Sequence, residues 1–186
     1  MTGKKNIVFG FLFLVITAAL GPYMITVIYP DVNEAQSAKQ DKVGKLQLMQ
    51  SNDFELDLEP LTANDIARNN TSAILALNSH LNQSSVIDEI KGGPHAHGNL
   101  EALLNIAAGL VLCFIAASTL IKQLISWAFI AGTLLHSGLL YIVVIFEQAW
   151  AGQLLGLGIG PILILLGLLM IGITAVTGFK GRIVED

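Results

Sequence analysis

The chain has 186 residues, of which 53% are hydrophobic and only 13% are charged, and its net charge is −4. Soluble domains usually carry about 25% charged residues, so the composition indicates a protein whose main solvent is lipid. No basic cluster interleaved with aromatic residues is present, which argues against nucleic-acid binding. Cys113 is the single cysteine, so a disulfide framework and a thiolate metal site are excluded, and we interpret it as a small buried hydrophobe.

Residues 1–30 predict the first membrane-spanning helix. Lys4 and Lys5 precede a mostly apolar run over residues 6–29, which exceeds the about 20 residues that a span needs. A secretory signal has an apolar core of only about 7–15 residues and ends in a small-x-small site, which residues 18–20 match poorly. We therefore expect an uncleaved helix, kinked at Gly21-Pro22, where proline removes a backbone donor.

Residues 31–93 form a polar segment with ten acidic and five basic residues and no long apolar run. Alternating acidic and apolar residues over 53–59 predict a short extended piece. Thr62 predicts a helix start, and a loose apolar stripe then predicts one or two surface helices to about Glu89, with His80 as a solvated helical histidine. Gly92-Gly93-Pro94 is typical of a turn that ends the segment.

Three further spans are predicted over residues 99–121, 124–146 and 153–179, with a turn at Lys122-Gln123 between the first two. Because the loops between them are short, we expect these helices to pack as antiparallel neighbours. The predicted fold class is all-α: an integral membrane four-helix bundle with a polar extracytoplasmic insert between helices one and two. The chain accordingly divides into three parts. Residues 1–30 form the first transmembrane helix, residues 31–93 the polar extracytoplasmic segment, and residues 94–186 the other three transmembrane helices with a cytoplasmic tail.

The last span carries a packing pattern of its own. Gly152, Gly156 and Gly160 are four residues apart, which predicts one glycine face that lets another helix approach closely, within the protomer or between protomers. Pro161 predicts a bend in the same span, because neighbouring helices can satisfy the carbonyl that it frees.

Charges in the short loops predict the orientation. Lys4, Lys5, Lys122, Lys180 and Arg182 would all lie on one side, whereas the opposite short loop over residues 147–152 has no basic residue. The positive-inside rule then places both termini in the cytoplasm and residues 31–93 outside. The predicted location is a cell membrane, in particular a bacterial inner membrane, with the lipid bilayer as the first partner.

Polar residues inside the predicted spans are the candidate functional groups. His97, Glu101 and Asn105 are four residues apart and share one helical face. His136 lies near mid-membrane on the next span, where an imidazole needs a partner or a task, and Tyr141 lies nearer the outer surface. If the two faces meet, the bundle holds an outward-opening polar cavity.

Two kinds of chemistry suit these groups. A buried imidazole is a natural axial ligand for haem iron, and a surface metal ion bound by His95, His97 and Glu101 is a second option. The ordinary interpretations remain open beside them: rim histidines solvate a helix end, Glu101 is a favourable first-turn acid, and Asn105 and Tyr141 hydrogen-bond across helices.

Three segments follow one another over about residues 94–178: AHGNLEALLNIAAGLVL, GTLLHSGLLY and LGIGPILILLGLLMIGITAVTG. In this order they resemble the membrane-bound styrene oxide isomerase family and its uncharacterised four-helix relatives. The resemblance implies haem b held between the protomers of a trimer, with His97 as the iron ligand. It also implies that Asn105 and Tyr141 line the catalytic pocket, where ferric iron acts as a Lewis acid on a small apolar epoxide.

The chain departs from the family pattern in three respects. The gap between His97 and Asn105 is longer, the polar segment is longer, and His136 has no counterpart. A second intramembrane histidine would allow two axial ligands, which would favour electron transfer. We expect His97 as the haem or metal ligand, with His136 as the alternative or second cofactor ligand.

Two functional hypotheses follow. The first is a haem-bearing membrane protein related to the isomerases. The second is a non-catalytic membrane protein whose polar groups fix helix packing and whose outer segment binds a partner.

Overall fold

The computed structural model describes residues 2–56 and 59–183, and nearly all of them are helical. The backbone forms two compact units. Residues 1–21 and 89–186 form the first, which we call the bundle unit, and residues 22–88 form the second, which we call the hairpin unit. Four helical runs contain stretches long and apolar enough to cross a membrane, within 3–51, 63–114, 119–146 and 159–178. The all-α class and the four apolar helices are thus confirmed.

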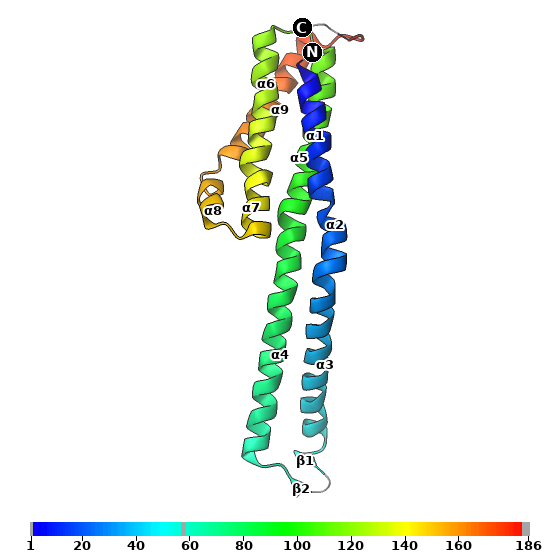
Figure 1. Ribbon diagram of the computed structural model, residues 1–186, viewed down its shortest axis with the longest axis vertical. Helices are drawn as coiled ribbons and strands as arrows, with labels where there is room; N and C mark the ends of the chain where they lie inside the picture. The colour runs from blue at the N-terminus through cyan, green and yellow to red at the C-terminus, as the bar shows by residue number, and fades with distance from the viewer. Residues whose placement is uncertain (1, 57–58, 184–186) are drawn as a thin grey trace. The chain divides into compact units, whose positions relative to one another are not determined.

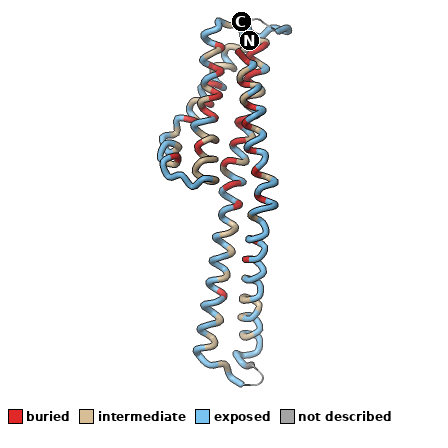
Figure 2. The backbone as a smooth tube through the Cα atoms, viewed as in Figure 1, coloured by how far each residue is buried: buried red, intermediate tan, exposed pale blue. Residues whose placement is uncertain are grey.

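The bundle unit is built from helices that pack side by side (Figure 1). Its elements are α1 (Gly3–Ala18), the start of α2 (Leu20–Tyr23), the π-helical turn η2 (Lys91–His95), α5 (Ala96–Phe114), α6 (Thr119–Thr133), the π-helical turn η3 (Leu134–Gly138), α7 (Leu139–Phe146), α8 (Ala149–Leu155) and α9 (Ile159–Gly178). Buried residues gather on the facing sides of these helices (Figure 2). Large apolar side chains such as Val15 and Val176 are exposed on its outer surface, which is consistent with helices apolar enough to span a membrane.

Glycines let α1 and α5 approach closely. A Cβ added at Gly10 of α1 would lie 2.6 Å from the carbonyl oxygen of Ala102, and one added at Gly109 of α5 would lie 2.6 Å from that of Gly3. At such a contact even alanine does not fit unless a helix moves. Small residues give membrane helices this close packing in place of a hydrophobic driving force.

The apolar core lies between α5, α6 and α9. Ala108, Leu112, Ile125 and Phe129 form a buried cluster, and the ring of Phe129 also lies against Gly167 of α9. This packing fixes α5 against α6, the two helices that carry the candidate site.

The predicted turn at Lys122-Gln123 is wrong. Helix α5 ends at Phe114 and α6 begins at Thr119, so Lys122 lies inside α6 with only 1% of its surface exposed. The connection is the apolar stretch that starts at Ile115, which pairs with Phe179 in an isolated β-bridge. Backbone pairing satisfies part of this connection, because Ala116 N–H donates to the Gly178 carbonyl and Lys180 N–H to the Phe114 carbonyl. Ser118 caps the start of α6, where its hydroxyl accepts the backbone N–H of Ile121.

The last span is also broken where the sequence predicted one helix. Helix α8 ends at Leu155, and Gly158 has φ of +67°, a left-handed conformation that glycine adopts readily. Gly152 and Gly160 therefore lie on different helices, and the predicted continuous glycine face does not form. Pro161 lies in the first turn of α9, where its missing N–H costs no helical bond, so it does not bend the helix.

The hairpin unit consists of two long helices joined by a short two-stranded connection (Figure 1). It contains η1 (Met24–Ile28), α3 (Tyr29–Ser51), β1 (Glu55–Leu56), β2 (Glu59–Pro60) and most of α4 (Ala63–Ile90), and β1 pairs antiparallel with β2. The extended piece predicted over residues 53–59 is confirmed at this pair, although Asp57 and Leu58 lie outside the described residues. It is wrong at Asp53 and Phe54, which form a turn with φ of +50° and +60°. Helix α3 was not predicted. Pro30 occupies its second position, where proline is tolerated.

Other local predictions for this segment have mixed outcomes. Thr62 does start α4, because its hydroxyl accepts the backbone N–H of Asp65 at 3.2 Å. The glycine-proline sequence is a kink rather than a full turn, with Gly93 in a non-helical conformation inside η2. His80 is half-buried, and its Nδ1 is buried without a hydrogen-bond partner among the described residues, so it is not a fully solvated side chain.

Candidate functional site

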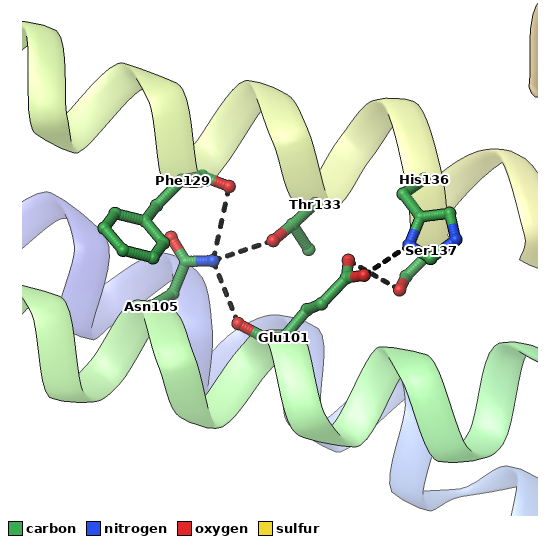
Figure 3. Close-up of polar contacts among 6 residues, drawn as sticks. All are labelled: Glu101, Asn105, Phe129, Thr133, His136 and Ser137. Carbon is green, nitrogen blue, oxygen red and sulfur yellow. Dashed lines mark hydrogen bonds and ion pairs between the residues drawn. The ribbon is translucent and has the colours of Figure 1, made fainter. Parts of the chain in front are cut away.

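The candidate site lies between α5 and the α6–η3–α7 run, near the start of α5 (Figure 3). Glu101 is its centre, with only 4% of its surface exposed. Its Oε1 is hydrogen-bonded to His136 Nδ1, and its Oε2 accepts the hydroxyl of Ser137 at 2.6 Å. Because a carboxylate only accepts, the imidazole nitrogen that faces it carries the proton.

The π-helical turn explains how two consecutive residues reach one carboxylate. His136 and Ser137 both lie in η3, and neighbouring residues of a regular α-helix point in clearly different directions. A π turn closes over one more residue than an α turn, and such turns occur frequently at functional sites. The local backbone therefore presents both donors to Glu101.

His97 completes a cluster with Glu101 and His136. One ligand atom from each of the three residues can be chosen so that all lie within 4.8 Å of one another. The rings of His97 and His136 make an edge-to-face contact, with centroids 5.0 Å apart and an interplanar angle of 70°. His97 is exposed, and its imidazole makes no hydrogen bond within the described residues. Its nitrogens are therefore available to a ligand.

The separation of the two imidazoles does not fit bis-histidine ligation of one haem within a chain. Each axial nitrogen would lie about 2 Å from the metal, so the ring centroids would be roughly 6 Å apart with the macrocycle between them. The observed 5.0 Å edge-to-face contact leaves no space for that plane. One axial histidine per chain fits the arrangement.

Asn105 is fully buried, and its carboxamide is occupied by the protein itself. Its Nδ2 donates to Thr133 Oγ1 at 2.9 Å and to the Glu101 carbonyl at 3.0 Å (Figure 3), and its Oδ1 accepts from Asn6 Nδ2 at 3.1 Å. Asn6 in turn is hydrogen-bonded to Ser126. This network favours a packing role for Asn105 over contact with a substrate.

Tyr141 does not join the cluster. It is half-buried on α7, and its ring contacts Phe146 with centroids 5.9 Å apart. Within the described residues its phenol makes no hydrogen bond, so the group remains available.

His95 is not part of the cluster either. Its Nδ1 lies 3.0 Å from the carbonyl oxygen of Thr17 on α1. The surface metal site predicted from His95, His97 and Glu101 is therefore changed in one member, because His136 takes the place of His95.

Four polar residues of this region were missed by the sequence analysis: Asn6, Ser126, Thr133 and Ser137, all buried. A signal for three of them was present. Ser126, Thr133 and Ser137 are separated by seven and four residues, which places them on one face of the helix. Each was overlooked because a single hydroxyl in an apolar run carries little weight alone.

Comparison of the chain with protein-family models, with curated proteins and with solved structures finds no match. The resemblance to the styrene oxide isomerases therefore remains a prediction from the quoted residues, and the function has to be argued from the geometry.

Proposed function

We propose that this chain is a multi-pass membrane protein that binds haem b through His97. The observation that carries the proposal is the exposed imidazole at the start of α5, which makes no hydrogen bond in the described residues. The neighbouring imidazole of His136 is held by Glu101. Both ring nitrogens of His97 are open to a ligand, whereas His136 is held at Nδ1 and keeps only Nε2, so we assign the iron to His97.

When haem is bound, His97 would hold it, while His136 stays bonded to Glu101. When bound, ferric haem would supply a Lewis acid, which suits the isomerisation of a small apolar epoxide that the sequence resemblance implies. Tyr141 is the protein's candidate hydrogen-bond donor to such a substrate. The exposed position of His97 also suits a cofactor shared between protomers, as in the trimer that the resemblance implies.

Visible spectroscopy tests the cofactor proposal. The protein is expressed with ample haem supply and purified in detergent, and we expect a Soret band that is lost in His97→Ala. His95→Ala is the matched control, because that histidine lies two residues away but bonds the Thr17 carbonyl. Absence of a Soret band in the wild type, or haem loss in His136→Ala with retention in His97→Ala, would overturn the assignment.

Tyr141→Phe separates binding from catalysis. Haem content should stay unchanged, because a phenol donates a hydrogen bond here and does not hold the iron. Conversion of an aryl epoxide to its aldehyde should fall by about 10²-fold if the phenol acts on the reacting oxygen. Equal rates for the variant and the wild type would remove Tyr141 from the reaction.

A non-haem metal ion is the second candidate, favoured by the three ligand atoms within 4.8 Å. Two imidazoles and one carboxylate are a ligand set for zinc or non-haem iron. Stoichiometric metal in a preparation without a Soret band, lost in Glu101→Ala, would select this function.

The non-catalytic alternative is supported by Asn105, whose carboxamide is fully used in packing. It predicts neither a Soret band nor stoichiometric metal in the wild type. The same spectroscopic and metal analysis therefore separates all three functions.

For the membrane orientation, we propose that both termini face the cytoplasm. The start of α1 and the end of α5 lie together, as do the ends of α5 and α9. The basic residues near these ends therefore belong to one end of the bundle unit, as the positive-inside rule requires.

A further inference from the structure

We propose that Glu101 is a positioning residue for His97 and acts through His136. The buried carboxylate fixes the His136 ring, and that ring fixes the orientation of the His97 imidazole. The inference rests on the proposed role of His97 as the cofactor ligand. It adds that Glu101 and His136 determine the orientation of the His97 ring.

The first step is the clamp on His136. Glu101 Oε1 is hydrogen-bonded to His136 Nδ1, and its Oε2 accepts Ser137 Oγ at 2.6 Å. Both carboxylate oxygens are thus engaged by consecutive residues of η3, which prevents rotation of the carboxyl group. Bonding at Nδ1 also sets the tautomer of His136, leaving Nε2 as its unprotonated nitrogen when the ring is neutral.

The second step is the backbone support of Glu101 itself. Its carbonyl oxygen accepts Asn105 Nδ2 at 3.0 Å, and the same nitrogen donates to Thr133 Oγ1. The turn of α5 that carries the carboxylate is therefore tied to α6 directly below the site. Such surrounding hydrogen bonds are what hold a ligand set in register.

The third step is the contact between the rings. His136 meets His97 edge to face with centroids 5.0 Å apart, and aromatic rings prefer this geometry over a face-to-face stack. His97 has no hydrogen bond of its own in the described residues, so this contact is what limits its rotation. Loss of the clamp should free both rings together.

The first experiment uses haem-free protein labelled with [¹⁵N]histidine in detergent micelles. We expect His136 as the Nδ1–H tautomer, and Glu101→Leu should convert it to a mixture and shift the resonances of His97. Glu101→Gln should largely restore both, because its amide oxygen still accepts the imidazole proton and its NH₂ can donate to Ser137. Thr174→Ala is the control: it removes a hydroxyl of α9 that donates only to the Met170 carbonyl and lies outside the network of Glu101 and Asn105.

The second experiment uses haem-loaded protein. Glu101→Leu should retain haem but change the electron paramagnetic resonance spectrum of the ferric iron, with recovery in Glu101→Gln. Unchanged His97 resonances in a folded Glu101→Leu protein would overturn the positioning role. A wild-type protein without a Soret band would instead overturn the haem proposal, and the haem-free experiment would still decide the role of Glu101.

Discussion

Asn105 joins three helices through one side chain. It accepts from Asn6 of α1, sits on α5, and donates to Thr133 of α6. Between membrane-spanning helices, such hydrogen bonds each contribute about 0.6–2 kcal/mol. A single carboxamide thus holds together the elements that position the site.

Asn105→Leu should lower the stability of the folded protein by about 1–3 kcal/mol. It leaves the Asn6 amide and the Thr133 hydroxyl buried without the hydrogen bonds that Asn105 makes to them. Thermal unfolding in detergent measures the effect. Asn78→Leu, on an exposed position of α4, is the control and should change stability by less than about 0.5 kcal/mol. Haem content per folded molecule should stay unchanged, and a selective loss of cofactor without destabilisation would instead place Asn105 in the binding site.

The residues of the site were predictable in part. Spacing alone aligned His97, Glu101 and Asn105 on one face. The predicted depths were wrong, because they separated His97 at the rim from His136 near mid-membrane, whereas the two rings are in contact. Sequence could not show that Glu101 would turn to His136 while Asn105 turned to Asn6, because helix rotation depends on packing across the whole bundle. Ser137 was not predicted for a similar reason: it reaches the same carboxylate as His136 from the π turn, which the sequence does not reveal.

At the scale of elements, the close contact between α1 and α5 allows a direct test of the helix packing. Gly10→Ala should destabilise the protein by about 1–3 kcal/mol, as overpacking usually does, because its new methyl group would meet the Ala102 carbonyl and the Ile106 side chain. Gly172→Ala is the matched control, since a Cβ added there would meet no described atom within 4 Å apart from its own stretch of helix. Equal melting temperatures for the two variants in detergent would contradict this packing.

The positions of the helices were easier to predict than their ends. Long apolar runs identified the four candidate spans by composition alone. The break between α5 and α6 was misplaced because polarity marked Lys122, whereas the actual connection has only Ser118 as a polar residue and pairs its backbone with the segment around Phe179. The break before α9 depends on the left-handed conformation of Gly158, which a run of similar glycines does not single out.

At the scale of the whole molecule, the proposed orientation places residues 31–93 outside the cell. In a Cys113→Ala background, Ser51→Cys should react with an impermeant maleimide added to intact cells. Lys180→Cys should react only after the membrane is opened, because the basic end of the bundle unit faces the cytoplasm. Mass spectrometry of the labelled protein measures both. Labelling of Lys180→Cys alone in intact cells would reverse the orientation.

The π turn η3 has a consequence for how the site relates to the fold. It contains one residue more than an α turn between α6 and α7. Deletion of Leu135 should therefore let the helix continue regularly, with the flanking helices still in phase with their neighbours. Circular dichroism and melting should stay close to the wild type, while His136 loses its bond to Glu101. A single codon would then separate a helical scaffold with this cluster from the same scaffold without it.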